Sequence, residues 1–141
     1  MSQSDTKVGS FRVLAGEDLT DKEGYLVKMT HDSGVPEVKL PADNGDYAVF
    51  AVINDGADGE NVDVLPLEAG ANVRLALKGT CNPGDLMVPA DTATAADKGK
   101  VRALPAAAGT YRGLGIAEEK GVDGQRVLLR PAMIGNVTVT E

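Results

Sequence analysis

Apolar and polar residues alternate along most of this chain, in short stretches that turn-forming residues separate. In the stretch 72–78, Val73, Leu75 and Leu77 occupy every second position, so they fall on one face of an extended strand. The stretch 47–53 is almost entirely apolar, as is typical of a strand buried on both faces. Glycine, proline, asparagine and aspartate occupy the intervening positions. The pattern therefore predicts many short strands and almost no helix.

The strands that this pattern predicts cover residues 11–14, 25–29, 37–40, 47–53, 62–66, 72–78, 86–88, 100–104, 111–117 and 126–130, with further strand propensity at 136–140. The segment 90–98 is small and polar, and we expect a flexible hairpin tip there. The alternate glycines Gly113 and Gly115 leave one face of their strand without side chains, which makes room for a neighbouring chain segment. The fold class is therefore all-β.

The second half of the chain repeats the first. The segment 40–47, Leu-Pro-Ala-Asp-Asn-Gly-Asp-Tyr, recurs at 104–111 as Leu-Pro-Ala-Ala-Ala-Gly-Thr-Tyr. The pairs that align beyond it are Phe50 with Leu114, Val52 with Ile116, Val62 with Val127, Pro66 with Pro131 and Gly70 with Gly135. These residue types build turns and strands, and none is a nucleophile, a base or a metal ligand.

The repeat and the chain length together set the expected domain organisation. Halves this short bury little surface as independent domains, so we expect two sequence-related halves that share the core of one small β-barrel or β-sandwich. Residues 14–135 form this single β domain, with repeat units at about 14–70 and 71–135. Residues 1–13 are predicted to be a flexible, extended N-terminal arm, and residues 136–141 a C-terminal tail.

The charge of the chain narrows the classes of partner. Fourteen basic and 21 acidic side chains give a formal net charge of −7. Nucleic-acid binding needs a basic stripe and membrane-surface binding a basic helix, and the sequence has neither. No apolar run reaches membrane-spanning length, and residues 1–7 lack the apolar core of a signal peptide. We therefore expect a protein made in a cytoplasm, with neither nucleic acid nor membrane as its partner.

The candidate chemistry is sparse. His31 is the one histidine and lies in a predicted turn, while Cys81 is the one cysteine and cannot form an internal disulfide. The acidic segment 54–63 does not fit the spacing of an EF-hand loop, so a solvated turn is the better interpretation. The sequence therefore predicts no catalytic residue, no cofactor and no metal site, and a protein that is not an enzyme.

Three motifs in the second half resemble those of phage capsid cement, or head decoration, proteins. They are Gly84-Asp85-Leu86, Gly115-Ile116-Ala117 and Val127-Leu128-Leu129. The resemblance covers about residues 70–131 and extends more faintly to 16–66. It implies a virion structural protein, often a homotrimer, that binds the major capsid protein on the outer surface of an assembled capsid and secures the shell.

The two ends of the chain are the predicted sites of contact with the capsid or with other subunits. These residues are Phe11, Arg12 and Val13 in the arm, and Val137 and Val139, which could add a strand to a neighbouring sheet. Two other functions stay open: another phage module, such as a fibre base or head–tail adaptor, and a β-barrel that binds a small ligand or carbohydrate. The few aromatic residues argue against the second, since binding pockets favour aromatic walls.

Overall fold

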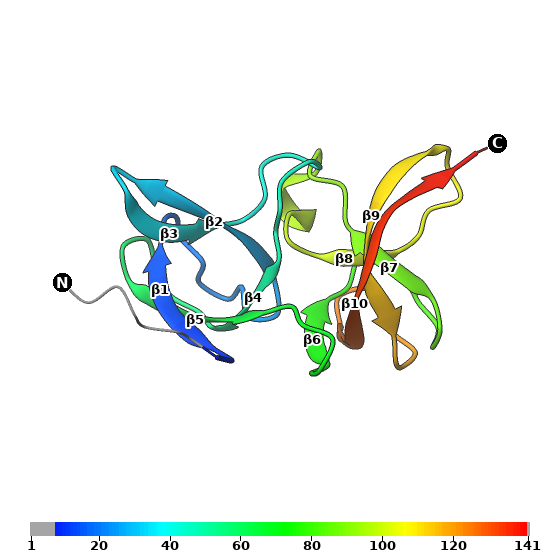
Figure 1. The fold of residues 1–141 in the computed structure, drawn as a ribbon, viewed down its shortest axis with the longest axis horizontal. Helices are drawn as coiled ribbons and strands as arrows, with labels where there is room; N and C mark the ends of the chain where they lie inside the picture. The colour runs from blue at the N-terminus through cyan, green and yellow to red at the C-terminus, as the bar shows by residue number, and fades with distance from the viewer. Residues whose placement is uncertain (1–7, 141) are drawn as a thin grey trace.

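The computed structural model describes residues 8–140, and within them the chain forms ten strands and one 3₁₀ turn (Figure 1). The elements are β1 (Phe11–Ala15), β2 (Leu26–Asp32), β3 (Val35–Lys39), β4 (Phe50–Asn54), β5 (Asn61–Pro66), β6 (Val73–Ala76), β7 (Leu86–Pro89), η1 (Ala95–Asp97), β8 (Val101–Ala103), β9 (Gly109–Ala117) and β10 (Arg126–Val139). The predicted all-β class is confirmed, and most predicted strands coincide with observed ones within a few residues.

The first five strands close into a small barrel. Their order is β1-β3-β2-β4-β5, and β1 completes the circle by pairing with β5 antiparallel and with β3 parallel. The hairpin of β2 and β3 reverses at Ser33 and Gly34, whose φ angles of 49° and 86° suit a tight two-residue turn. Closure leaves few strand edges open to other chains.

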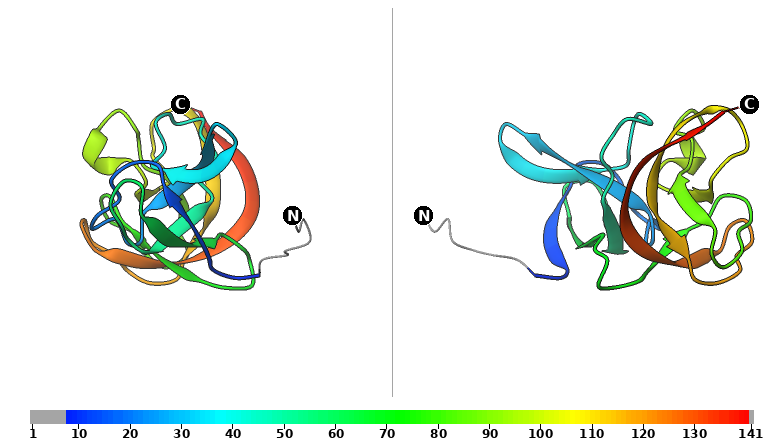
Figure 2. Two further views of the ribbon diagram at one scale, coloured as in Figure 1. Left: turned by 90° about the vertical axis from the view of Figure 1, so that its left-hand side faces the viewer. Right: turned by 45° about the vertical axis from the view of Figure 1, so that its right-hand side comes forward.

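The last five strands form a second sheet with the order β6-β10-β9-β7-β8. The two halves share one strand order. If the five strands of each half are numbered 1 to 5 in chain order, both sheets read 3-2-4-5-1, starting at β3 in the barrel and at β8 in the second sheet. A parallel bridge between Leu77 and Val101 brings the end of β6 beside β8, as β1 lies beside β3. The two sheets lie one after the other along the long axis (Figures 1 and 2). That the halves arose from one unit stays a prediction.

Strand register corrects the alignment of the two halves. Val52 pairs with Val64 in the barrel, and Ala117 pairs with Leu129 in the second sheet. Since β5 and β10 align as the sequence predicts, Val52 corresponds to Ala117 and not to Ile116. The inserted residue therefore lies before β4, one strand earlier than the sequence alignment placed it.

The core is divided in two, where the sequence analysis expected one. The cluster inside the barrel comprises Val13, Ala15, Leu19, Val27, Val38, Val52, Val62 and Val64. The second cluster comprises Leu26, Ala48, Ala51, Val73, Leu75, Leu77, Cys81, Met87, Val101, Leu114, Ala117, Val127 and Leu129. Its first three members come from the first half, so that half supplies part of the core of the second.

The predicted arm and tail are both shorter than the sequence suggested. Residues 1–7 and 141 lie outside the described residues. Phe11, Arg12 and Val13 belong to β1, because Phe11 pairs with Val64 and Val13 with Val62 across the barrel closure. Residues 136–139 belong to β10, where they pair with 109–112 of β9.

The segment 90–98 is held by polar contacts, in contrast to the flexible tip that was expected. It contains η1, whose Asp97 is buried between the ammonium groups of Lys78 and Lys100 at 3.6 and 3.5 Å. The backbone and hydroxyl groups of Thr92 donate hydrogen bonds to Asn44 Oδ1 at 2.9 and 3.0 Å. These contacts connect the segment to the loop between β3 and β4.

Candidate interaction surface

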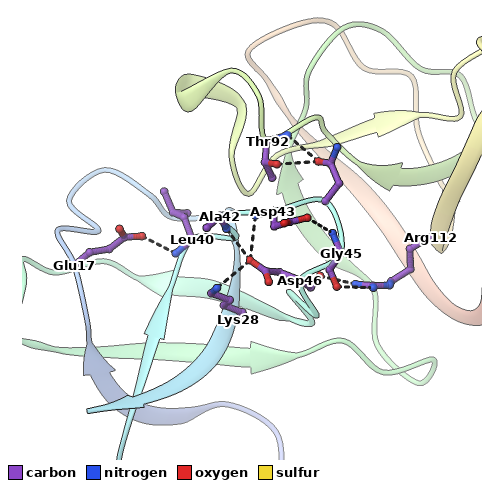
Figure 3. A network of polar contacts seen from close by, with 10 residues as sticks. Glu17, Lys28, Leu40, Ala42, Asp43, Gly45, Asp46, Thr92 and Arg112 are labelled. Atoms are coloured by element: carbon purple, nitrogen blue, oxygen red, sulfur yellow. Dashed lines mark hydrogen bonds and ion pairs between the residues drawn. The ribbon is translucent and has the colours of Figure 1, made fainter. Parts of the chain in front are cut away.

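The loop 41–47, which is most of the first copy of the repeated segment 40–47, lies where the two halves meet (Figure 3). Asp46 organises it, since one carboxylate oxygen accepts hydrogen bonds from Lys28 Nζ at 2.9 Å, from Ala42 N at 2.8 Å and from Asp43 N at 3.1 Å. These contacts lower the pKa of the Asp46 carboxyl, first through Lys28 and then through the backbone of Ala42. The loop is thus held in one conformation against the second half.

Arg112 of β9 joins this loop to the second sheet. Its guanidinium donates hydrogen bonds to the carbonyl oxygens of Asp46 and Gly45, the second at 3.1 Å (Figure 3). It also lies over the ring of Tyr47, 4.3 Å from the ring centroid. Arg112 therefore orients Tyr47, whose side chain remains 74% exposed.

β10 bulges beside this junction. Pro131 pairs with Gly115 and Gly135 with Gly113, so three residues of β10, 132–134, stand opposite Leu114 alone. Pro131 has no backbone N–H to donate, and Gly135 has a φ of 79°, which glycine adopts most readily. The bulge pushes Met133 out of the sheet, and its side chain is fully exposed.

An apolar surface lies beside the bulge, and we call it the bulge surface: it consists of the exposed residues Tyr47, Val49, Met133 and Ile134 and the half-buried Leu67. A hollow of about 390 Å³ lies in it, between Val49 and Leu67 of the first half and Leu114 and Pro131 of the second. A second hollow, of about 480 Å³, adjoins it along 132–136 of β10. Exposed apolar surface of this kind is typical of sites where proteins contact other molecules.

The predicted contact residues at the start of the chain lie in the barrel wall. The ring of Phe11 packs edge-on against Phe50, with 5.7 Å between centroids. Val13 is buried in the barrel core, so a partner cannot reach it in this structure. Arg12 is exposed, and its Nε lies 3.3 Å from Asp63 Oδ1.

Val137 and Val139 are half-buried in the last part of β10, which pairs with β9 on one side. The opposite side of β10 pairs with β6 at residues 126–129. Beyond those residues, within the described part of the chain, no strand pairs with that side of β10. Their predicted role in strand addition stays a prediction.

His31 and Cys81 lie in separate structural settings. His31 is at the β2–β3 turn, where its Nδ1 accepts a hydrogen bond from Gly34 N at 2.9 Å. Cys81 is buried in the second cluster, and burial raises the pKa of its thiol, which disfavours the reactive thiolate. Among residues 8–140, no group of three His, Cys, Asp or Glu side chains is placed to hold a metal ion.

Sequence reasoning missed the bulge surface, although two signals for it were present. Pro131 and Gly135 bracket the apolar residues 132–134 between the predicted strand at 126–130 and the strand propensity at 136–140, and both residue types mark bulges in sheets. What the sequence did not show is that Tyr47 of loop 41–47 and residues 132–136 of β10 line one hollow, because they belong to halves distant in the chain.

The fold defines an all-β protein of two small five-stranded sheets in tandem. The chain is similar to the crystal structure of the N base of head fiber gp8.5 in bacteriophage phi29, with a TM-score of 0.66 and 18% identity. The similarity covers 94% of this chain and 97% of that chain, and at this identity it shows the fold. No family model and no curated protein matches the sequence. No helix among residues 8–140 has both the length and the apolar character needed to cross a membrane.

Proposed function

We propose that this chain is a phage virion structural protein, without catalytic activity, that binds the outer surface of an assembled capsid and stabilises it. The bulge surface carries the proposal. It exposes Met133 completely and Tyr47 largely, beside an open hollow, at the junction between the halves. A protein–protein contact would bury these side chains, which otherwise remain in water. The fold similarity to a phage head fiber base supports a place on the virion.

The partner would be the major capsid protein, and the contact would be repeated over many copies. Binding by several linked copies gives strong attachment even where each contact is modest. A homotrimer fits this arrangement, because each chain contributes two sheets of the same strand order. Three chains would present six similar modules, which match a lattice with local sixfold character.

The test is co-sedimentation of the purified protein with empty capsids of its phage. We expect the wild-type protein to sediment with capsids and Met133→Asp to bind at least tenfold more weakly. An exposed methionine that becomes buried contributes on the order of 1.5–3 kcal/mol, and a tenfold change corresponds to about 1.4 kcal/mol. The matched control is Val122→Asp, because Val122 is an exposed apolar residue in the β9–β10 turn, away from the bulge.

Three results would contradict the proposal. The first is a wild-type protein that does not sediment with capsids at any concentration. The second is Met133→Asp binding as tightly as the wild-type protein. The third is Val122→Asp weakening binding as much as Met133→Asp does, because added negative charge and not the bulge surface would then decide binding.

The fold similarity favours one second candidate, the base of a head fiber. Both candidates bind the capsid, but a base anchors an appendage and need not strengthen the shell. Thermal disruption of capsids with and without bound protein separates them: a cement raises the temperature at which the shell opens markedly, whereas a base raises it little. Capsids that lack tails should bind the protein in both cases, which distinguishes either candidate from a tail module.

A further inference from the structure

The strand registers give each residue at one end of the first half a counterpart in the second half. Leu26 pairs with Ala51, and Leu86 pairs with Ile116. The preceding turns agree, since Gly24 N donates to Val52 O at 2.8 Å and Gly84 N donates to Ala117 O at 2.9 Å. Gly24, Leu26 and Ala51 therefore correspond to Gly84, Leu86 and Ile116.

In the first half these residues are covered by the second half. Leu26 and Ala51 are fully buried in the second core cluster, among residues that come mostly from the second sheet. Two backbone hydrogen bonds cross the junction here, from Leu26 N to Gly99 O at 2.7 Å and from Ala76 N to Gly24 O at 2.8 Å. This end of the first half is thus an interface within the chain.

In the second half the counterparts are not covered to the same extent. Leu86 and Ile116 remain half-buried, and Gly84 is exposed where Gly24 is buried. A methyl group added at Gly24 would lie 3.1 Å from the Arg126 side chain and 3.3 Å from Arg74 O, whereas one added at Gly84 would meet nothing within 4 Å. The second half thus leaves partly exposed the kind of surface that the first half buries.

We propose that this end of the second half, Gly84 with Leu86 and Ile116, binds the first half of a second copy of this chain. The receiving residues are the counterparts of Arg74 and Ala76, which strand pairing identifies as Arg12 and Leu14. Arg12 is exposed and Leu14 is half-buried in β1. The inference rests on the proposed function, for which it supplies the contact between the copies of the trimer.

The two surfaces lie at opposite ends of the molecule. β1 and β3 are at one end of the long axis, and β7 and β9 are toward the other (Figure 1). A contact between them is therefore head-to-tail, and head-to-tail contacts of one kind close into a ring when their rotation permits. In that ring, contacts within and between chains would alternate and resemble one another.

One contact of the junction is not conserved between the halves. An ion pair between Glu23 and Arg126, at 3.6 Å, crosses the junction within the chain. Their counterparts are Pro83 and Asn61, which carry no charge. The contact between copies therefore lacks this ion pair. Added salt should strengthen the contact by screening the repulsion between chains of net charge −7.

Complementary variants test the head-to-tail contact in the full-length protein. Ile116→Lys disrupts one surface and Leu14→Lys the other, and mass is measured by light scattering after size exclusion. We expect the wild-type protein to have three times the chain mass and each variant alone to be monomeric. An equal mixture of the two variants should form a dimer and grow no further, because it contains one intact pair of surfaces. Met133→Lys is the control and should keep the wild-type mass.

A lysine at a half-buried position can unfold the chain. A second pair of variants, at exposed positions, therefore tests the same contact independently. Pro83 and Asn61 are exposed, so Pro83→Glu with Asn61→Arg should restore the missing ion pair between copies without altering the fold. The double variant should dissociate at a concentration about two- to fivefold lower than the wild-type protein, the effect of a surface ion pair. Neither single variant should do so.

Several results would overturn the inference. They are a wild-type monomer at hundreds of micromolar, variants that keep the wild-type mass, a mixture of folded variants that stays monomeric, or a Met133→Lys variant that dissociates. Capsid binding is measured separately from these masses. A monomer that binds capsids would refute the contact between copies but not the proposed function. A trimer that does not bind capsids would refute the proposed function but not the contact between copies.

Discussion

Asp46 shows how one side chain fixes the junction between the halves. Its carboxylate is 24% exposed, and it accepts hydrogen bonds from Lys28 and from two backbone N–H groups of its own loop. Hydrogen bonds from a cation and from backbone donors favour the ionised carboxylate over the protonated form. Loop 41–47 therefore keeps its contacts with Arg112 while Asp46 carries its charge.

The lowered pKa of Asp46 predicts a dependence of stability on pH. Because its pKa is lower in the folded than in the unfolded protein, Asp46 stabilises the fold above its unfolded pKa of about 3.9. This stabilisation is lost as pH falls through the lower, folded pKa. Asp46→Asn should therefore be less stable than the wild-type protein at pH 7, and urea denaturation should show the difference shrinking below about pH 4.

The control for this experiment is Asp58→Asn, since Asp58 is an exposed residue of the β4–β5 loop. Its unfolding should match that of the wild-type protein at every pH. A constant difference between Asp46→Asn and the wild-type protein from pH 7 to pH 2 would show that the charge of Asp46 does not stabilise the junction.

Gly115 is a residue where the sequence correctly indicated a close approach of two chain segments. A Cβ atom there would overlap the carbonyl oxygen of Arg130 and lie 2.8 Å from its carbonyl carbon. Backbone atoms of a paired strand cannot move aside as a flexible side chain can. Gly115→Ala should therefore lower the free energy of unfolding by about 3 kcal/mol, measured by urea denaturation.

Gly70→Ala is the matched control for Gly115→Ala. A Cβ atom at Gly70 meets nothing within 4 Å, and its φ is not positive, so alanine fits without strain. Its unfolding free energy should stay within about 0.5 kcal/mol of the wild-type value. Equal effects at the two glycines would mean that the β9–β10 approach is looser than the structure shows.

Alternation of apolar and polar residues predicted the strands well, because each short strand buries one face. Val73, Leu75 and Leu77 are all buried as their spacing predicted. The bounds of β10 were not predicted, since this strand runs through Pro131 and a bulge to Val139. Proline and glycine usually end a strand, and here the pairing resumes beyond them because β9 is long enough to continue it.

The start of the chain shows why pairing over long distances escapes sequence reasoning. The sequence predicts a short strand at 11–14 but also assigns residues 11–13 to the arm, because nothing local shows which segment they pair with. Their place in the barrel depends on β5, some fifty residues later, which offers Val62 and Val64 as partners. The same limit applies to the bulge surface, which residues from both halves create.

The two halves of the molecule differ in how their cores are built. The barrel cluster contains residues of the first half alone, whereas the second cluster takes Leu26, Ala48 and Ala51 from the first half. The sequence repeat suggested equivalent halves, and the strand order agrees with this. The packing differs because the first half covers one end of the second, whereas at the other end Leu86 and Ile116 are only half-buried among residues 8–140.

This asymmetry predicts different behaviour for the separated halves. Residues 1–72 contain a closed barrel with its own core and should unfold cooperatively, although with a lower midpoint than the full chain, because Leu26 and Ala51 become exposed. Residues 67–141 lack those side chains and both backbone hydrogen bonds across the junction, so this half should show no cooperative transition at 25 °C. Circular dichroism during thermal and urea denaturation measures both. The prediction is that the second half depends on the first for its folding. A second half that unfolds cooperatively, together with a first half that does not, would show the opposite: that the barrel needs the second sheet.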